Sequence, residues 1–199
     1  MDKFGDIRPY TDAEARDAFK RMADDPHIEP ITNYIKPGLP VEAMRGLLSS
    51  LTSVWDFQHK VMYDVVTSII RQTTAGVTYS GLENLKDGRT HLLISNHRDI
   101  ILDPAIIQVL LYENKVHTTE IAVGDNLITS QFIEDITRSN GMIKVVRGGT
   151  PREIYSNSSH LSEYLRSKIG SGECSAWIAQ RNGRTKDGKD QTSQGLVKM

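Results

Sequence analysis

The sequence predicts an α/β fold in which a mostly parallel sheet is flanked by helices, with a helical extension at the N-terminus. Two observations support this prediction. Residues 1–75 have helical signals and almost no strand signal, whereas from residue 77 short apolar runs alternate with helical segments. Strands that alternate with helices are typical of a largely parallel sheet. We therefore expect an N-terminal helical region over residues 1–75 and an α/β domain over residues 76–199.

The N-terminal region begins with a capping box. Thr11 and Glu14 have the Thr-x-x-Glu spacing, which predicts a helix that ends before Pro26. A loop rich in helix breakers follows, with Pro30, Pro37, Gly38 and Pro40. Between residues 41 and 73, apolar residues recur at helical spacing, which predicts one long amphipathic helix or a pair of helices. Its apolar face either packs inside the protein or contacts a membrane surface or a partner.

Strands and helices are expected to alternate after residue 76. The expected strands are residues 77–79, 91–95, 117–123, 142–146 and 176–179. The expected helices are residues 104–112, 129–138 and 151–168. A second capping box, Thr150 with Glu153, and Pro151 at the first helical position predict the start of the last helix. In a parallel sheet, functional residues gather in the loops beyond the carboxyl ends of the strands, so we expect the site there.

Composition excludes several classes of protein. The chain has 24 Lys and Arg against 25 Asp and Glu, a formal net charge of −1, which argues against a nucleic-acid-binding protein. The single cysteine, Cys174, cannot form an intrachain disulfide, so we expect a reducing compartment. No apolar run approaches the roughly 18 residues of a membrane-spanning helix, and no signal peptide is visible. We therefore expect a cytoplasmic protein.

The loop after the expected strand 91–95 holds the most informative polar residues, His97, Asp99 and Asp103. A neutral imidazole can take a proton from a hydroxyl, and a carboxylate behind it fixes its tautomer. His97 and Asp103 therefore predict a general-base pair. Asp103 precedes Pro104 and also fits the N-cap of a helix, a role that is compatible with the first. The remaining histidines have no zinc-ligand spacing, so we expect no metal.

Two further loops combine glycine with arginine at the ends of expected strands. Arg147 is followed by Gly148 after the strand at 142–146, and Gly183 precedes Arg184 after the strand at 176–179. A guanidinium stays charged and matches the geometry of a phosphate or carboxylate. Each loop alone also fits a solvated turn. Together they indicate a site for an anionic ligand.

Taken in order, these three loops resemble the motifs of the glycerolipid acyltransferase family, which includes glycerol-3-phosphate and 1-acylglycerol-3-phosphate acyltransferases. The resemblance covers roughly residues 77–188. The family's first block, Asn-His-x-x-x-x-Asp, resembles Asn96, His97 and Asp103. Its second block, a strand that ends near an arginine, resembles the segment that ends at Arg147. Its third block, a Glu-Gly-x-Arg turn, resembles residues 182–184.

The first block departs from the family's pattern in its length. Five residues rather than four separate His97 from Asp103. The extra residue makes Asp99 a second candidate for the partner of His97, and we favour Asp103.

The third block and the end of the chain also depart from the pattern. Asn182 stands where the family has a glutamate, and Arg184 follows Gly183 without an intervening residue. The chain ends at Met199, before the position where the family's fourth block is expected. We therefore expect the α/β domain to be incomplete at its C-terminus.

The resemblance implies acyl transfer in phospholipid biosynthesis, without a metal or other cofactor. His97, oriented by Asp103, would deprotonate a hydroxyl of glycerol phosphate or lysophosphatidate, which attacks the thioester carbonyl of acyl-CoA or of an acyl-carrier protein. The substrate-binding residues would be Asn96, Arg98, Arg147, Asn182, Gly183 and Arg184. The resemblance also implies peripheral contact with the inner face of the membrane, with the N-terminal helical region adsorbing to the surface.

Two other functions also fit the sequence. A non-catalytic module that binds a lipid or an anionic ligand would keep the same fold and lack turnover. A hydrolase would use the same His-Asp pair to activate water. The two differ from an acyltransferase because neither consumes the thioester in a way that depends on an added acceptor.

Overall fold

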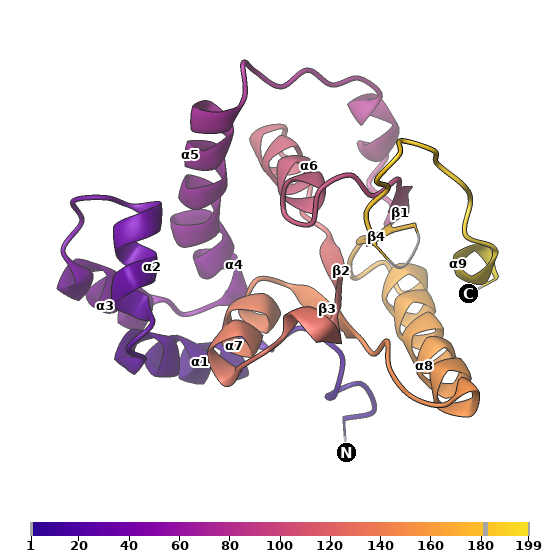
Figure 1. The fold of residues 1–199 in the computed structure, drawn as a ribbon, viewed down its shortest axis with the longest axis horizontal. Coiled ribbons are helices and arrows are strands. Elements are labelled where there is room, and N and C mark those ends of the chain that lie inside the picture. The colour runs from indigo at the N-terminus through magenta and orange to yellow at the C-terminus, as the bar shows by residue number, and fades with distance from the viewer. Residues whose placement is uncertain (1, 181–182, 199) are drawn as a thin grey trace. The chain divides into compact units, whose positions relative to one another are not determined.

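The computed structural model describes residues 2–180 and 183–198 (Figure 1). These residues form two compact units that interleave along the chain. The sheet unit comprises Met1–Ile7, Thr78–Asp125 and Ile143–Met199, and the helical unit comprises Arg8–Val77 and Asn126–Met142. The expected division between residues 75 and 76 stays a prediction.

The sheet unit is built on four parallel strands, which confirms the predicted α/β class. The strands are β1 (Leu92–Ser95), β2 (Glu120–Gly124), β3 (Met142–Val145) and β4 (Ala176–Ala179). Their order across the sheet is β1-β4-β2-β3, so the last strand of the chain lies between the first two. Each lies within a few residues of an expected strand.

The fifth expected strand, at residues 77–79, is wrong. This segment has no regular secondary structure, and Val77 and Tyr79 are exposed. It lies between Gly76 and Gly81, both of which have positive φ angles. A short apolar run has strand propensity but forms a strand only where a neighbouring strand pairs with it.

Four helical segments accompany the strands of the sheet unit within the described residues. They are η2 (Leu82–Leu85), α6 (Leu102–Glu113), α8 (Pro151–Gly170) and α9 (Gln194–Val197), and the short η3 (Asp125–Leu127) begins at its last residue before the helical unit. The connections through α6 and α8 cross the sheet in opposite directions, because β1 leads to β2 and β3 leads back to β4. Since such crossovers are right-handed, α6 and α8 cover opposite faces, as Figure 1 shows.

The second capping box starts α8 as predicted. The Thr150 side chain accepts a hydrogen bond from the Glu153 backbone, and the Glu153 carboxylate accepts one from the Thr150 backbone. One face of α8 then packs onto the sheet. The buried residues of this core are Ile7, Ile143, Leu161, Tyr164, Leu165 and Ala176.

The helical unit contains seven described helical segments. They are α1 (Asp12–Asp24), α2 (Ile28–Ile35), α3 (Val41–Ser50), α4 (Val54–Phe57), the π-helical η1 (Gln58–Met62), α5 (Tyr63–Thr73) and α7 (Gln131–Ser139). The capping box of Thr11 and Glu14 starts α1, which ends before Pro26, as predicted. The region from 41 to 73 is a pair of helices, because residues 51–53 separate α3 from the run of α4, η1 and α5.

Pro30 lies inside a helix rather than in the expected loop. It is the third residue of α2. The first turn of a helix leaves its backbone N–H groups without helical partners, so a proline costs no hydrogen bond there. The loop expected at 30–40 therefore shrinks to residues 36–40.

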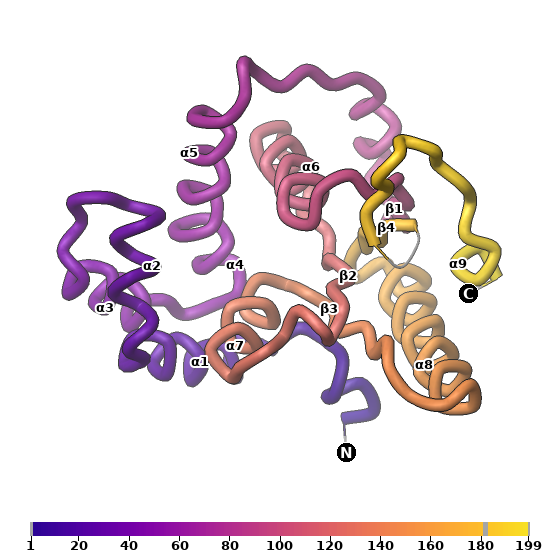
Figure 2. Tube along the Cα trace, viewed as in Figure 1, coloured from indigo at the N-terminus to yellow at the C-terminus, as the bar shows by residue number. Residues whose placement is uncertain are grey.

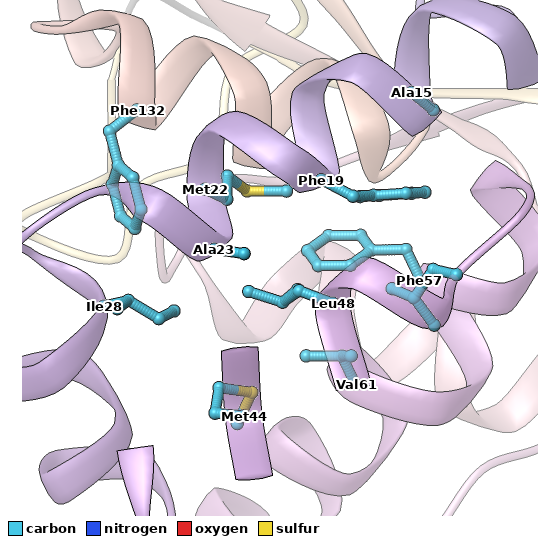
Figure 3. Close-up of a cluster of buried hydrophobic side chains, with 11 residues drawn as sticks. Ala15, Phe19, Met22, Ala23, Ile28, Met44, Leu48, Phe57, Val61 and Phe132 are labelled. Carbon is cyan, nitrogen blue, oxygen red and sulfur yellow. The ribbon is translucent and has the colours of Figure 1, made fainter. Parts of the chain in front are cut away.

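The apolar faces of these helices pack against one another. Figure 3 shows Phe19 and Met22 of α1 among Met44, Leu48 and Phe57 of α3 and α4. The rings of Phe19 and Phe57 lie 5.4 Å apart between centroids. The apolar residues between 41 and 62 thus supply an internal core, which is the packing alternative of the sequence analysis for this part of the range. Among the described residues, no helix combines the length and apolarity needed to cross a membrane.

Candidate active site

Two loops meet at the carboxyl ends of β1 and β4. The strands are parallel neighbours, so the chain leaves both at the same edge of the sheet. The Gln180 backbone N–H donates to the carbonyl of Ser95 at 2.8 Å, and the Thr185 backbone N–H donates to the carbonyl of His97 at 2.9 Å. The loop after β4 therefore runs alongside the loop that carries His97, as the yellow segment in Figure 2 shows.

His97 and Asp103 are in direct contact. Nδ1 of His97 lies 3.1 Å from Oδ2 of Asp103, and the two side chains are only 12% and 17% exposed. Because an ionised carboxylate only accepts hydrogen bonds, a neutral imidazole in this contact carries its proton on Nδ1 and keeps the lone pair on Nε2. The same Oδ2 accepts hydrogen bonds from the backbone N–H groups of Arg98 at 2.7 Å and Asp99 at 2.9 Å. The carboxylate that orients the imidazole is itself fixed by the loop.

Asp99 contacts the start of α6 instead. Its Oδ1 accepts hydrogen bonds from the backbone N–H groups of Ile101 at 2.8 Å and Leu102 at 2.7 Å. These bonds, the one from Leu102 foremost, hold the pKa of Asp99 below its ordinary value, and the nearby charge of Arg184 adds to the effect.

The prediction that Asp103 is the N-cap of this helix is wrong. The helix begins at Leu102, so Asp103 is its second residue. The longer loop gives Asp99 the position from which a carboxylate reaches the free N–H groups of the first turn. Asp103 can then turn back toward His97.

Asn96 and Arg98 contact a residue that the sequence analysis missed. Nδ2 of Asn96 donates to Asp190 at 2.9 Å, and Nη2 of Arg98 donates to the same carboxylate at 2.5 Å. Gln180 donates from Nε2 to Oδ1 of Asn96 at 3.4 Å. No local signal marks Asp190 in the sequence, because its partners lie more than ninety residues earlier. Only the adjacency of β1 and β4 brings these groups together.

Arg184 and Arg147 lie at different distances from His97. Arg184 follows β4, which pairs with β1, and its charge reaches Asp99. Arg147 follows β3, three strand positions from β1, a separation of roughly 14 Å at the usual strand spacing. Both side chains are exposed, and no acidic side chain of the described residues forms an ion pair with either. The sheet therefore brings Arg184 to His97 and leaves Arg147 at the opposite edge.

The remaining predicted residues of the third block are Asn182 and Gly183. Gly183 has a φ angle of +135°, which L side chains rarely adopt, so a residue with a Cβ would be strained there. Asn182 lies outside the described residues.

Other chemically notable groups lie at the opposite end of the sheet. Glu120 begins β2 and Cys174 precedes β4, so both are at the amino ends of their strands. Burial raises the pKa of the Cys174 thiol to about 11, which leaves it protonated and a poor nucleophile at neutral pH. Burial also raises the pKa of Glu120, whose Oε2 accepts a hydrogen bond from Tyr164 at 2.7 Å.

No group of three His, Cys, Asp or Glu side chains suited to a metal ion occurs in residues 2–180 and 183–198. That the protein works without a metal stays a prediction. The candidate site therefore consists of the imidazole of His97, the carboxylate of Asp103 that holds its Nδ1, and the exposed guanidinium of Arg184 in the neighbouring loop.

The comparisons with known proteins identify a family. The family model described as acyltransferase matches residues 76–194, more than half of the chain. The matched region includes His97, Asp103 and Asp190. No curated protein matches the chain.

Proposed function

Since the chain belongs to the acyltransferase family, we propose that it moves a fatty acyl group from an acyl thioester to a hydroxyl of glycerol phosphate or lysophosphatidate. The donor is acyl-CoA or an acyl-carrier protein, and the product is an intermediate of phospholipid biosynthesis. The observation that carries the proposal is the contact of His97 with Asp103, which leaves Nε2 of the imidazole free to act as a base.

In the proposed reaction, Nε2 of His97 takes the proton of the acceptor hydroxyl as its oxygen attacks the thioester carbonyl carbon. The carbon–sulfur bond then breaks, and the leaving thiolate receives the proton from the imidazolium. Asp103 stabilises the imidazolium while it exists. General-base catalysis contributes typically about 10²–10⁴-fold, so the positioning of both substrates supplies much of the remaining acceleration.

Arg184 is the best-placed residue to bind the phosphate of the acceptor. It lies beside the His97 loop, its side chain is exposed, and its charge acts on the nearby Asp99 carboxylate. A guanidinium binds phosphate through two parallel hydrogen bonds. We assign a smaller contribution to Arg147, at the far edge of the sheet, and to Arg98, whose charge Asp190 already balances.

Exposed apolar side chains beside the site support contact with a membrane or an acyl chain. Ile100 and Ile101, in the loop between His97 and α6, are 44% and 64% exposed. Apolar groups at the mouth of a site favour a substrate that resides in a bilayer. We propose peripheral attachment to the inner face of the membrane.

The test is thiol release from a long-chain acyl-CoA, measured with and without glycerol 3-phosphate or lysophosphatidate. The native chain is expected to release thiol in an acceptor-dependent manner, and His97→Ala is expected to lose this activity. His91→Ala is the matched control, because His91 contacts Asp87 at 3.0 Å at the other end of β1. It should retain activity.

Each other outcome contradicts the proposal in a different way. Thiol release that does not depend on an acceptor indicates a hydrolase. No release above the His97→Ala background indicates a module that binds its ligand without turnover. Full activity in His97→Ala excludes His97 as the base.

A further inference from the structure

Asp190 lies at the centre of a hydrogen-bond cluster around His97. Its Oδ2 accepts hydrogen bonds from Asn96 at 2.9 Å and from Arg98 at 2.5 Å. Its Oδ1 accepts one from Oγ1 of Thr185 at 3.2 Å. One carboxylate thus holds both neighbours of His97 and the residue whose backbone N–H binds the carbonyl of His97.

These bonds restrain the His97 loop in addition to those made by Asp103. Asp103 holds the imidazole and the backbone N–H of Arg98. Asp190 holds the side chains of Asn96 and Arg98, and Arg98 also donates to the carbonyl of Gly188 at 3.4 Å. Residues 96–98 of the loop are therefore each hydrogen-bonded to Asp103, to Asp190 or to both. A loop of this kind has few alternative conformations that keep all its hydrogen bonds.

We propose that Asp190 is a positioning residue of the acyl-transfer site, which fixes the backbone around His97 so that the imidazole keeps its contact with Asp103. The inference rests on the proposed function, because it assigns Asp190 a role in presenting Nε2 to the acceptor hydroxyl. Asp190 acts through Asn96 and Arg98 and touches no reacting atom.

The charge of Arg98 explains why a carboxylate is needed at this position. The side chains of Asp190 and Arg98 are 27% and 47% exposed, so water screens part of their ion pair. Charge-assisted hydrogen bonds are roughly twice as strong as neutral ones. Without Asp190, the guanidinium would remain in a loop with two other carboxylates, Asp99 and Asp103. Competition for Asp103 would weaken its contact with His97.

Asp190 could instead occupy the position of a substrate phosphate on Arg98, which would make it an inhibitory contact. The two roles differ in their kinetic consequences. A positioning residue affects kcat, whereas a competitor for the phosphate affects the KM of the acceptor. The hydrogen bonds from Asn96 and Thr185 favour positioning, because neither is needed to neutralise Arg98.

The kinetic test compares Asp190→Ala and Asp190→Asn with the native chain. We expect Asp190→Ala to lower kcat by about ten- to a hundred-fold, since small misplacements in an active site have effects of this size. The KM of the acceptor should stay within about two-fold. Asp190→Asn keeps an acceptor oxygen but loses the charge that pairs with Arg98, so it should recover only part of the loss. A lower acceptor KM in Asp190→Ala would overturn the positioning role.

Asp187→Ala is the matched control for this segment. Asp187 lies in the same turn, and its Oδ1 accepts a hydrogen bond from the Lys189 backbone two residues later. It makes no contact with the His97 loop among those the structure shows. The control should match the native chain in both kcat and KM.

A second test needs no turnover. Nitrogen-15 NMR of the histidine rings reports which nitrogen carries the proton, and the His97 signal is identified by its absence in His97→Gln. In the native chain, His97 should hold the single tautomer with the proton on Nδ1. In Asp190→Ala, its signals should shift toward a mixture of tautomers, whereas Asp187→Ala should leave them unchanged.

Unchanged His97 signals in Asp190→Ala would overturn the inference, whatever the activity of the variant. Loss of the proposed function has a different signature. If the native chain shows no acyl transfer, the kinetic comparison fails for every variant, while the NMR comparison still decides whether Asp190 positions His97.

Discussion

Asp103 contacts His97, whereas Asp99 of the same loop accepts hydrogen bonds from the start of α6. Single substitutions can distinguish these two roles. Asp103→Asn removes the charge that stabilises the imidazolium of His97 and leaves only a neutral amide oxygen to accept from Nδ1. We expect kcat to fall by at least about a hundred-fold. Steady-state kinetics with an acyl-CoA donor measure this loss.

Asp99→Asn is the control for that prediction. Asp99 binds the first N–H groups of α6, so its substitution should lower the free energy of unfolding by about 0.5–1 kcal/mol and change kcat little. Urea denaturation of both variants gives the stability comparison. A larger catalytic loss in Asp99→Asn than in Asp103→Asn would mean that Asp99, and not Asp103, is the catalytic partner of His97.

Arg184 and Arg147, which follow the carboxyl ends of β4 and β3, are expected to differ in their effect on acceptor binding. Arg184→Gln should raise the KM of the acceptor by about ten-fold or more, because one charge-assisted contact with phosphate is worth about 1.5–3 kcal/mol. Arg147→Gln should raise it less, since Arg147 lies three strand positions from the His97 loop. Measuring KM for glycerol 3-phosphate in both variants tests the order. Equal effects would mean that the phosphate lies between the two arginines.

Among the helices, α1 depends on a capping box reinforced by an ion pair. The Glu14 carboxylate accepts hydrogen bonds from the Thr11 backbone at 2.7 Å and from Arg8 at 2.6 and 2.9 Å. The bonds from Arg8 are the main reason that the pKa of Glu14 falls to about 2, from 4.5 in an unfolded chain. Because the folded pKa is the lower one, this stabilisation is present above pH 4.5 and is lost as the pH falls to about 2.

Glu14→Gln should therefore destabilise the protein at neutral pH and match the native chain near pH 2. We expect a difference of about 1 kcal/mol at pH 7, because the Glu14 side chain is 42% exposed and solvent screens the pair. Urea denaturation at several pH values measures it. Glu153→Gln removes the corresponding acid of α8, which has no arginine partner in its capping box, and should give a smaller pH dependence. Equal pH dependence in both variants would show that Arg8 adds nothing.

Helices whose ends are marked by capping residues could be predicted from the sequence. Elements that form only through contacts with other parts of the chain could not. The capping boxes at Thr11 and Thr150 gave the starts of α1 and α8 to the residue. Residues 77–79 had the composition of a strand but no neighbour to pair with. Pro30 looked like a helix breaker, but the first turn of α2 accommodates it. Local chemistry decides the first kind of feature, and tertiary contacts decide the second.

For the whole molecule, the order of the strands determines which predicted residues form a site. The sequence presents the loops of His97, Arg147 and Arg184 as equivalent, each at the end of an apolar run. The order β1-β4-β2-β3 places the last loop beside the first and the middle loop at the far edge. Asp190 could not be found for the same reason, because its partners are neighbours only across β1 and β4. The contact of His97 with Asp103 was predictable, since both belong to one loop.

The proposed membrane contact depends on where the active-site loop meets the surface of the protein. Ile100 and Ile101 are exposed apolar side chains in the loop between His97 and α6. Burying one isoleucine fully is worth about 1.5–3 kcal/mol, so even partial insertion of both would change membrane affinity noticeably. Replacing both with serine should lower binding to phosphatidylglycerol-containing vesicles by about ten-fold or more in a sedimentation assay. Activity toward a water-soluble short-chain donor should change little.

Tyr155→Ser is the control for this prediction. Tyr155 is 76% exposed on α8, so its loss removes a similar apolar surface away from the His97 loop. If the loop is the membrane contact, this variant binds vesicles as the native chain does. If Tyr155→Ser loses binding and the double isoleucine variant keeps it, the membrane lies against α8. The acyl chain would then need another route to Nε2 of His97, and the proposed attachment would be wrong.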